Sequence, residues 1–390
     1  MPGYELIGEE EKKAVCEVFD KGGVLYRYAL NDKRQDIFRV DDFEKEVANK
    51  AGTKYCLCVC NGTAALKLAL FALGVKAGDE VITQSFTFVA TVEAILEIGA
   101  KPIIVEIDNS LNMDPIDLER KITPKTKVIM PVHMAGVAAK MDQILALAVK
   151  HNITVLEDSA QAMGATYRGK WLGTIGAAGI YSLDIGKIIT TGEGGLLVTD
   201  NKDIYLKARE YSDHGHQQNP NFPRGEDTRS YWGFNYKATE LHGAIGLAQL
   251  KKMDFILERQ QYNKRKIKGA IKDIAGIEFR EVPNEDGDAG DTLIFYLSSS
   301  DKAFSFAKAL CRRGIGTKNL PDAINWHFAG TWTHIFHLYP EYRGKDLEAI
   351  WSQSAGYLRR AIALPIMVNM SEERLKLIID VIHDVAREIM

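Results

Sequence analysis

Lys187 is the side chain best placed in this sequence to carry covalent chemistry. It follows an apolar run at 177–183, typical of a buried strand, and precedes the glycine-rich segment 192–195. A lysine partly withdrawn from water has a lowered pKa, and its free amine is a nucleophile for carbonyl carbons. The glycine-rich segment lacks the Gly-Lys-Ser/Thr ending of a nucleotide-hydrolysing phosphate loop. For a lysine taken alone, a surface position is the simpler interpretation.

Two further segments could cooperate with such an amine. Asp158 ends the apolar run 153–158, and a buried carboxylate is costly unless a positive group pairs with it. Gly62, Thr63 and Ala64 follow another apolar run, where small residues let backbone N–H groups approach an anion at a helix start. Each has a structural alternative, because Asp158 could cap a helix and the glycine could serve a tight turn.

An aromatic pair, Phe86 and Phe88, follows the apolar run 79–84. Such a ring could stack on a flat ligand, although core packing is the alternative for either residue. Together the segments offer an anion cradle, a carboxylate, an amine and a stacking ring, each after an apolar run. These are the parts that a site for pyridoxal 5′-phosphate (PLP) needs.

The elements that must bring these residues together alternate between apolar runs and helical patterns. Helical spacing occupies 63–73, 91–98 and 141–150. Strands separated by helices of this length indicate βαβ units and a mostly parallel sheet covered on both faces. Such sheets bind ligands beyond the carboxyl ends of their strands, where all four groups fall. The expected strands are 55–60, 79–84, 101–107, 127–133, 153–158, 177–183 and 194–200.

The pattern changes after residue 238. Residues 239–274 are expected to form one long helix, with apolar side chains at helical spacing. A polar, glycine-rich loop at 283–292 follows, and the remainder mixes strand and helix patterns in a smaller α/β domain. We therefore expect an N-terminal arm at 1–25, a large domain at 26–250 and a small C-terminal domain at 251–390.

Composition excludes several classes of protein. The 390 residues carry a net charge of −3, so no basic surface for nucleic acid is expected. No apolar run reaches the ~18 residues of a membrane span, and the acidic start lacks the apolar core of a secretory leader. Cys56, Cys58 and Cys60 alternate as on one face of a buried strand, at a spacing unsuited to zinc. We expect a cytoplasmic protein with free thiols, no metal and no membrane or nucleic-acid partner.

In order and spacing, five motifs resemble the DegT/DnrJ/EryC1/StrS sugar aminotransferases, a family with the aspartate-aminotransferase fold (fold type I) of PLP enzymes. The similarity covers nearly the whole chain. It implies an α/β fold with a mostly parallel central sheet in a large domain and a smaller C-terminal α/β domain. The motifs are GTAA at 62–65, SFTFVAT at 85–91, EDSAQ at 157–161, the segment from Ser182 through Lys187 to GEGG at 192–195, and GFNYK at 233–237 with GLAQL at 246–250.

The resemblance implies a role for each matching residue. Lys187 would bind the cofactor covalently and carry a proton, and Asp158 would pair with the ring nitrogen. Gln161 would reach the ring hydroxyl, and Phe88 would stack on the ring. Asn235 would reach the phosphate bound by the neighbouring subunit, which implies a homodimer with shared active sites. The remaining cofactor contacts would be Gly62, Thr63, Ala64 and Ser182.

The resemblance also implies the substrates, with L-glutamate as amino donor and a keto or aldehyde sugar as acceptor. Asp184 stands where many members have His, and Lys237 where the usual residue is Arg; both departures bear on substrate choice. A PLP-dependent sugar dehydratase is the nearest alternative, but such enzymes carry His in place of Lys187. A non-catalytic binding protein would not need both Lys187 and Asp158. A nicotinamide-dependent oxidoreductase would show Gly-x-Gly-x-x-Gly after the first strand, which is missing here.

A narrower resemblance, to family members that make 8-amino-3,8-dideoxy-manno-octulosonate (8-amino-Kdo), lies in the chain start and in 133–142, 212–216 and 325–327. It implies a free keto-sugar acid, 8-oxo-Kdo, as acceptor, in surface polysaccharide or lipopolysaccharide biosynthesis. A nucleotide-linked keto-sugar is the alternative acceptor. The residues expected near the sugar are His214, His216 and His327, although a solvated loop is the alternative for the first two.

Overall fold

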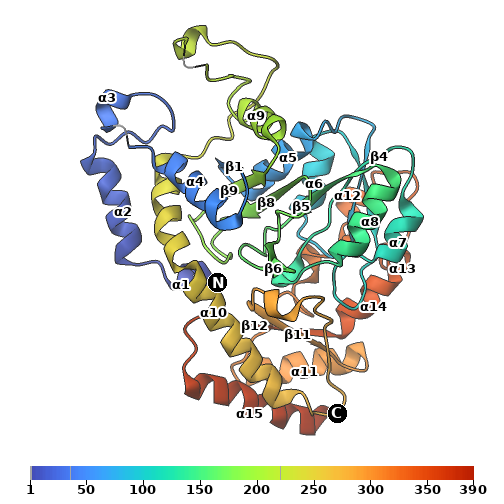
Figure 1. Cartoon of the computed structure of the whole chain (residues 1–390). Helices are drawn as coiled ribbons and strands as arrows, with labels where there is room; N and C mark the ends of the chain where they lie inside the picture. The colour runs from blue at the N-terminus through green and yellow to red at the C-terminus, as the bar shows by residue number, and fades with distance from the viewer. Residues whose placement is uncertain (1, 36, 220) are drawn as a thin grey trace.

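A seven-stranded sheet forms the centre of the protein (Figure 1). In the computed structural model, which describes residues 2–35, 37–219 and 221–390, the strand order is β1-β9-β8-β5-β4-β2-β3. All seven strands overlap those expected from the sequence. Their bounds are β1 (Tyr55–Val59), β2 (Glu80–Gln84), β3 (Lys101–Val105), β4 (Thr126–Ile129), β5 (Thr154–Asp158), β8 (Ala178–Ser182) and β9 (Gly195–Thr199).

The direction of the strands fixes where their ends meet. The strands β8, β5, β4, β2 and β3 run parallel, and β9 is antiparallel to both of its neighbours, β1 and β8. The expected mostly parallel sheet is confirmed. Because β1 therefore runs in the same direction as β8, the carboxyl ends of six strands meet at one edge. That edge receives Asn61, Asp158 and Ser182, together with the segment after Gln84.

Helices cover both faces of the sheet. In β1, Leu57 packs with α5, α6 and α9, whereas Cys56 and Cys58 pack with α4 and α10 on the other face, which is the two-residue period of a strand. Cys60 lies beyond the end of β1 and packs on the same side as Leu57, against the core formed with α5, α6 and α9. The expectation that all three cysteines share one face is therefore wrong for Cys60. The helices are α4 (Arg39–Ala51), α5 (Gly62–Ala72), α6 (Ala90–Glu97), α7 (Pro115–Lys121), α8 (Met141–His151) and α9 (Lys202–Tyr211).

A second sheet, antiparallel and of order β10-β11-β12, carries the C-terminal part of the chain. Its strands pack against α11 and α15 in a separate hydrophobic core. Helix α10 (Glu240–Ile271) runs from the central sheet to this second core, as Figure 1 shows, so the expected boundary at 250 falls inside a helix and the domain limits stay a prediction. The elements are β10 (Glu278–Phe279), β11 (Thr292–Tyr296), β12 (Ala361–Pro365), α11 (Ser300–Arg312), α14 (Ser352–Arg360) and α15 (Glu372–Ile389).

The described residues 212–219 and 221–239 have little regular structure and project beyond α9 at the top of Figure 1; they are called the projecting segment below. Within the described ranges, no helix combines the length and the apolar character needed to span a bilayer. The smaller elements are α1 (Pro2–Glu5), α2 (Glu9–Asp20), α3 (Asn31–Arg34), α12 (Thr333–Phe336), α13 (Leu347–Ile350) and the hairpin of β6 (Thr166–Tyr167) with β7 (Lys170–Trp171).

Candidate active site

A cavity of about 460 Å³ lies at the carboxyl ends of the parallel strands. Ligand pockets commonly measure about 300–1,000 Å³, so this cavity has room for a ring-sized ligand and part of a substrate. Segments after β1, β2, β5 and β8 line it together with residues of the C-terminal part. The lining residues predicted from the sequence are Gly62, Thr63, Phe88, Asp158, Gln161, Ser182, Lys187 and His327.

Lys187 reaches the cavity from the turn after β8. Asp184 builds this turn, because its carbonyl accepts from the Lys187 N–H at 3.0 Å and its Oδ1 accepts from the Gly186 N–H at 2.9 Å. Burial lowers the pKa of Lys187; Asp184 opposes this and Lys318 adds to it. In the described part of the chain, Lys187 Nζ forms neither a hydrogen bond nor an ion pair. Such an amine is a nucleophile when its neutral form is favoured.

Asp158 is the buried carboxylate of the cavity, only 2% exposed at the end of β5. Its Oδ2 accepts from Thr91 Oγ1 at 2.8 Å, and its Oδ1 accepts from the Ala160 N–H at 3.1 Å. Burial raises the pKa of Asp158 above its usual value; Thr91, the Ala160 N–H and Lys187 oppose this without reversing it. A carboxylate in this state gains most from a cation placed beside it.

The neighbouring acid, Glu157, serves the fold instead. It is fully buried, and its carboxylate accepts from the backbone N–H groups of Gly173, Ile175 and Gly176 at 2.6–2.8 Å. The ring of His133 lies 3.0 Å from the same carboxylate. All four contacts point into the protein, so of the two adjacent acids only Asp158 lines the cavity.

The start of α5 and the end of β8 form an anion cradle. Asn61 Oδ1 accepts from the Ala64 N–H at 2.7 Å and caps the helix, which leaves the first N–H groups without an intrahelical partner. A Cβ on Gly62 would lie 3.0 Å from Ser182 Cβ, so a larger residue would crowd the space beside the Ser182 hydroxyl. The glycine predicted to approach an anion therefore stands where a side chain would fill the cradle.

Phe88 presents an aromatic face to the cavity. Its side chain is 41% exposed, whereas Phe86 is 2% exposed and packs in the core with Phe328. The ring of Trp326 lies nearly parallel to Phe88, with 6.3 Å between the ring centroids. Of the aromatic pair singled out in the sequence, only Phe88 is therefore open to a ligand.

Two polar side chains complete this side of the cavity. Burial lowers the pKa of His327 to about 4, and Lys187 and Lys318 act in the same direction, so its ring is neutral at pH 7. Gln161 Oε1 accepts from the Ala135 N–H at 2.9 Å, which leaves the amide NH₂ as a donor. Both residues can bind a ligand through hydrogen bonds without adding charge.

Four predicted residues do not line the cavity. Ala64 uses its N–H in the helix cap. His214 and Asn235 are exposed on the projecting segment, and His216 is buried there with its Nδ1 3.3 Å from Asp227. A role for Asn235 toward a second subunit, and roles for the two histidines near a sugar, stay predictions.

Lys237, one of the two departures from the family pattern, anchors the projecting segment. Its Nζ pairs with the fully buried Asp213 at 2.5 Å, and Arg224 pairs with the same carboxylate at 2.6 Å. Burial acts to raise the pKa of Asp213, but the two cations outweigh it and hold the pKa at about 2. Lys237 therefore fixes the base of the segment.

Sequence reasoning missed three residues of the site. Thr91, inside the SFTFVAT motif, bonds Asp158 from the first turn of α6. Asp291 and Lys318 come from the C-terminal part and pair with each other at 2.5 Å. An acidic residue placed directly before the apolar strand β11 was a usable pattern for Asp291, but nothing in the spacing of Lys318 pointed to the cavity.

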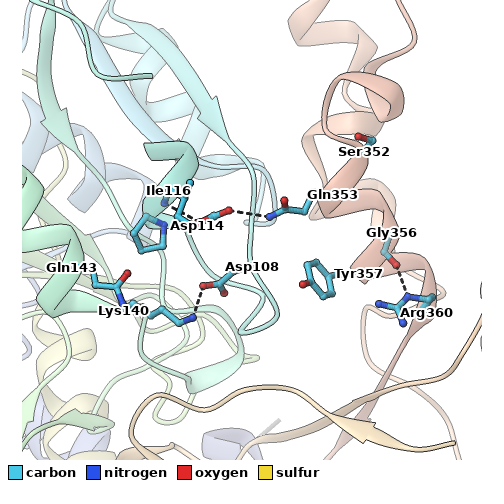
Figure 2. Close-up of a pocket in the computed structure, with 11 residues that line it drawn as sticks. Asp108, Asp114, Ile116, Lys140, Gln143, Ser352, Gln353, Gly356, Tyr357 and Arg360 are labelled. Atoms are coloured by element: carbon cyan, nitrogen blue, oxygen red, sulfur yellow. Dashed lines mark hydrogen bonds and ion pairs between the residues drawn. The ribbon is translucent and has the colours of Figure 1, made fainter. Parts of the chain in front are cut away.

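A second hollow lies apart from this cavity, between α7, α14 and the loop before α8 (Figure 2). Lys140 pairs there with Asp108 at 2.9 Å, Asp114 accepts from Gln353 at 3.0 Å, and Arg360 donates to the Gly356 carbonyl at 3.1 Å. It contains none of the residues predicted to do chemistry. The described ranges also hold no group of three or more His, Cys, Asp or Glu side chains suited to a metal ion.

The cavity residues fit a flat, phosphorylated aldehyde with a protonated ring nitrogen. The cradle beside Gly62 suits a phosphate, since a Cβ would occupy that space. Asp158, buried with a raised pKa, suits the cation, and the open face of Phe88 suits the ring. The amine of Lys187 suits the aldehyde. This combination is the chemistry of pyridoxal 5′-phosphate.

Known proteins are similar to this chain, two of those that follow over nearly its whole length. Spore coat polysaccharide biosynthesis protein SpsC of Bacillus subtilis (strain 168) is 34% identical, over 98% of this chain and 96% of its own. GDP-perosamine synthase of Caulobacter vibrioides is 45% identical over 55% of this chain and 56% of its own. An aminotransferase structure from Psychrobacter cryohalolentis superposes with a TM-score of 0.86 at 28% identity, over 98% of both chains. The expected fold type I architecture is confirmed.

The family model of the DegT/DnrJ/EryC1/StrS aminotransferases matches residues 25–383. That span includes every motif named in the sequence, from GTAA to GLAQL. The chain belongs to the DegT/DnrJ/EryC1/StrS aminotransferase family.

Proposed function

We propose that this aminotransferase uses pyridoxal 5′-phosphate to move an amino group from L-glutamate to a keto or aldehyde sugar. The proposal is carried by one cavity that holds the amine of Lys187, the buried carboxylate of Asp158 and the anion cradle of Gly62 and Ser182. When bound, pyridoxal 5′-phosphate supplies an aldehyde that condenses with amines and a ring that withdraws electrons. Known proteins of matching length and fold support the aminotransferase chemistry.

Each residue that would hold the cofactor suits a different part of it. Lys187 would bind its aldehyde carbon, and Asp158 its ring nitrogen. Phe88 would cover one face of the ring, and the Gln161 amide would donate to the ring hydroxyl. The phosphate would lie in the cradle formed by Gly62, Thr63 and Ser182.

Lys187 is also the residue suited to move the proton of the reaction. Once it is freed from the cofactor, its Nζ, whose pKa is lowered by burial, takes the proton from the Cα of the amino donor. His327 has a pKa of about 4 and is a weaker base, and Asp158 already accepts from Thr91 and Ala160. Lys187 is therefore the base of the site.

Replacing Lys187 tests this assignment directly. Reduction with borohydride in the presence of pyridoxal 5′-phosphate should fix the cofactor to the peptide that contains Lys187. Lys187→Ala should lose the visible absorbance of the bound cofactor and the conversion by L-glutamate to the pyridoxamine form. Lys140→Ala, which removes a partly buried lysine of the hollow in Figure 2, is the matched control and should behave as wild type. Full turnover by Lys187→Ala would refute the assignment.

A sugar dehydratase is the second candidate activity on this fold. The retained Lys187 disfavours it, because the dehydratases that resemble this chain carry His at that position. Incubation with L-glutamate and a keto-sugar separates the two activities. An aminotransferase releases an amino sugar together with 2-oxoglutarate, whereas a dehydratase releases a sugar that has lost a hydroxyl group and gained no nitrogen.

For the acceptor, we propose 8-oxo-Kdo, which would give 8-amino-Kdo for a surface polysaccharide or lipopolysaccharide. The support is the sequence resemblance in the chain start, 133–142, 212–216 and 325–327, the last of which includes the cavity residue His327. Mass spectrometry of the products from 8-oxo-Kdo and from a GDP-linked 4-keto-sugar, each with L-glutamate, decides between the acceptors. Amination of the nucleotide sugar alone would remove the 8-oxo-Kdo proposal.

We further propose a cytoplasmic homodimer in which Asn235 of one copy completes the phosphate site of the other. The proposal is supported by the exposure of Asn235 and of two large aromatic side chains beside it, Trp232 and Phe234, which a second copy could cover. Inactive Lys187→Ala and Asn235→Ala proteins, mixed and reassembled, test it. Hybrid dimers would contain one intact site, so about a quarter of wild-type activity should return, whereas Asn235 acting within its own chain would restore none.

A further inference from the structure

The cavity contains one cation that the proposed chemistry does not use. Among the described residues that line it, Lys187 and Lys318 are the only lysines or arginines, and His327 is neutral at pH 7. Lys187 is committed to the cofactor in the proposed function. L-glutamate and the proposed keto-sugar acid both carry a carboxylate. The ammonium of Lys318 is therefore the positive charge of the cavity that remains to bind a substrate carboxylate.

Lys318 is held by a closed ring of hydrogen bonds with two residues before and at the start of β11. Its Nζ donates to Asp291 Oδ2 at 2.5 Å and to Thr292 Oγ1 at 3.1 Å. The Thr292 hydroxyl in turn donates to Asp291 Oδ1 at 3.1 Å. An ammonium has three N–H donors, so one remains, and no other described side chain or carbonyl takes it.

The backbone around Lys318 is equally well fixed. The N–H of Lys318 donates to the Ala363 carbonyl of β12 at 2.7 Å, and the N–H of Ile366 donates to the Asp291 carbonyl at 2.9 Å. Asp291 is 7% exposed, whereas the Lys318 side chain is 31% exposed toward the cavity that it lines. Asp291 therefore serves as a buried anchor, and the ammonium is presented to a ligand.

We propose that Lys318, positioned by Asp291 and Thr292, is the carboxylate-binding residue for the substrates of this active site, a proposal that rests on the proposed function. The phosphate of the cofactor has its own cradle of helix N–H groups and the Ser182 hydroxyl, which needs no lysine. Asn319 and Gln161 line the same cavity and can donate neutral hydrogen bonds, but only Lys318 adds charge attraction for a carboxylate.

The carboxylate has two possible sources, L-glutamate and a keto-sugar acid, and the two half-reactions separate them. Each substrate reacts alone with one form of the bound cofactor, so its half-saturating concentration is read from the absorbance change. Holoenzyme of Lys318→Met is compared with wild type and with Lys140→Met. Lys140 is a matched control because it is 23% exposed, pairs with two acids and lies in the other hollow (Figure 2).

Loss of a charged hydrogen bond predicts that Lys318→Met raises the half-saturating concentration of L-glutamate by about 10- to 100-fold. The absorbance of the bound cofactor should change little, because Lys318 is not assigned to the cofactor. Lys318→Arg keeps the charge and should lose less. Lys318→Gln, which can still bond Asp291 and Thr292, is the second variant if Lys318→Met does not fold, with the same loss expected.

Amides of glutamate identify the carboxylate. L-glutamine lacks the side-chain charge, and the α-amide of glutamate lacks the α-carboxylate. In wild type, the amide that lacks the recognised carboxylate should bind more weakly, and in Lys318→Met that difference should vanish. If Lys318→Met raises the half-saturating concentration of a keto-sugar acid as much as that of L-glutamate, Lys318 also binds the acceptor. If the value for the sugar acid does not change, Lys318 binds the donor alone.

Unchanged half-saturating concentrations for both L-glutamate and the sugar acid in Lys318→Met and Lys318→Gln would overturn the role of Lys318. That result differs from a failure of the proposed function, in which wild type itself would show no absorbance change with L-glutamate. Losses of equal size in Lys140→Met would also overturn it, because a general effect of lysine removal would then explain them.

Discussion

Replacing Thr91 by valine is the sharpest test of how the site keeps Asp158 charged. Thr91 Oγ1 donates to Asp158 Oδ2 at 2.8 Å, and its oxygen lies 2.6 Å from Thr87 Oγ1. Thr91 and Asp158 are each 2% exposed, so water cannot replace the Thr91 hydroxyl as a donor to the carboxylate. Valine has nearly the shape of threonine, so the change removes the hydrogen bonds to Asp158 and Thr87 and leaves the packing of α6 in place.

The size of the effect follows from the environment of the carboxylate. A buried hydrogen bond to a charged acceptor contributes about 1.5–3 kcal/mol. Because that hydrogen bond opposes the effect of burial, Thr91→Val should raise the pKa of Asp158 further, beyond the rise that burial already causes. A less firmly charged Asp158 holds the ring nitrogen of the cofactor less well, and we expect turnover to fall roughly 10- to 100-fold.

Three measurements separate this effect from simple damage. Turnover with L-glutamate should fall, the dissociation constant of pyridoxal 5′-phosphate should rise, and the acid limb of the pH–rate profile should move to higher pH. Thr91→Ser keeps the hydroxyl, should stay close to wild type in all three, and is the matched control. Wild-type turnover and an unmoved pH profile in Thr91→Val would refute the assignment of Asp158 to the cofactor nitrogen.

Three further predictions concern other parts of the molecule. The pKa of His327 is about 4 in the folded protein, against its usual 6.5 in an unfolded chain. Between these pH values the unfolded chain therefore binds a proton at His327 that the folded protein does not bind. The free energy of unfolding should therefore fall as the pH drops from 6.5 to 4, by at most about 3 kcal/mol, and denaturant titrations of His327→Gln should show a smaller fall. A Cβ on Gly195 would lie 2.3 Å from the Asn61 carbonyl oxygen, so Gly195→Ala should displace the anion cradle and weaken cofactor binding in a fluorescence titration, whereas Gly269→Ala, at an open helix position, should not. Burial raises the pKa of Cys56 and Cys58, so neither thiol should react with a thiol reagent until the protein unfolds, as peptide mapping would show.

The sequence predicts most of the fold because its local patterns agree with the tertiary structure. Strand β5 and its neighbour in the sheet, β8, each appear as an apolar run of the right length, and the parallel sheet then brings their ends together. Lys187, Asp158 and Ser182 could be placed on one edge from this reasoning alone, since each follows or ends such a run. The choice of Asp158 over Glu157 could not, because both belong to one strand end and only the contacts of Glu157 with the 173–176 backbone distinguish them.

Contacts between distant segments account for the rest. Thr91 is four residues from Thr87 and 67 from Asp158, so nothing local marks it as a donor to that carboxylate. Lys318 reaches the cavity only because β11 and β12 place Asp291 beside it, a pairing set by the second sheet. The surroundings of His216 could not be predicted either: its Nδ1 lies 3.3 Å from Asp227 of the same segment, and its role near a sugar stays a prediction.

Two buried acids of this protein show why charge placement decides the chemistry. Asp213 has Lys237 and Arg224 against it, its pKa is held near 2, and it is satisfied within the chain. Among the described residues, Asp158 pairs with no cation and accepts hydrogen bonds from Thr91 and the Ala160 N–H, and burial leaves its pKa raised. A buried carboxylate without a cation is unstable on its own, so it persists where a ligand brings the positive charge. Lys318 has its counter-ion Asp291 in place, and its ammonium keeps one further N–H donor, which we propose binds a substrate carboxylate.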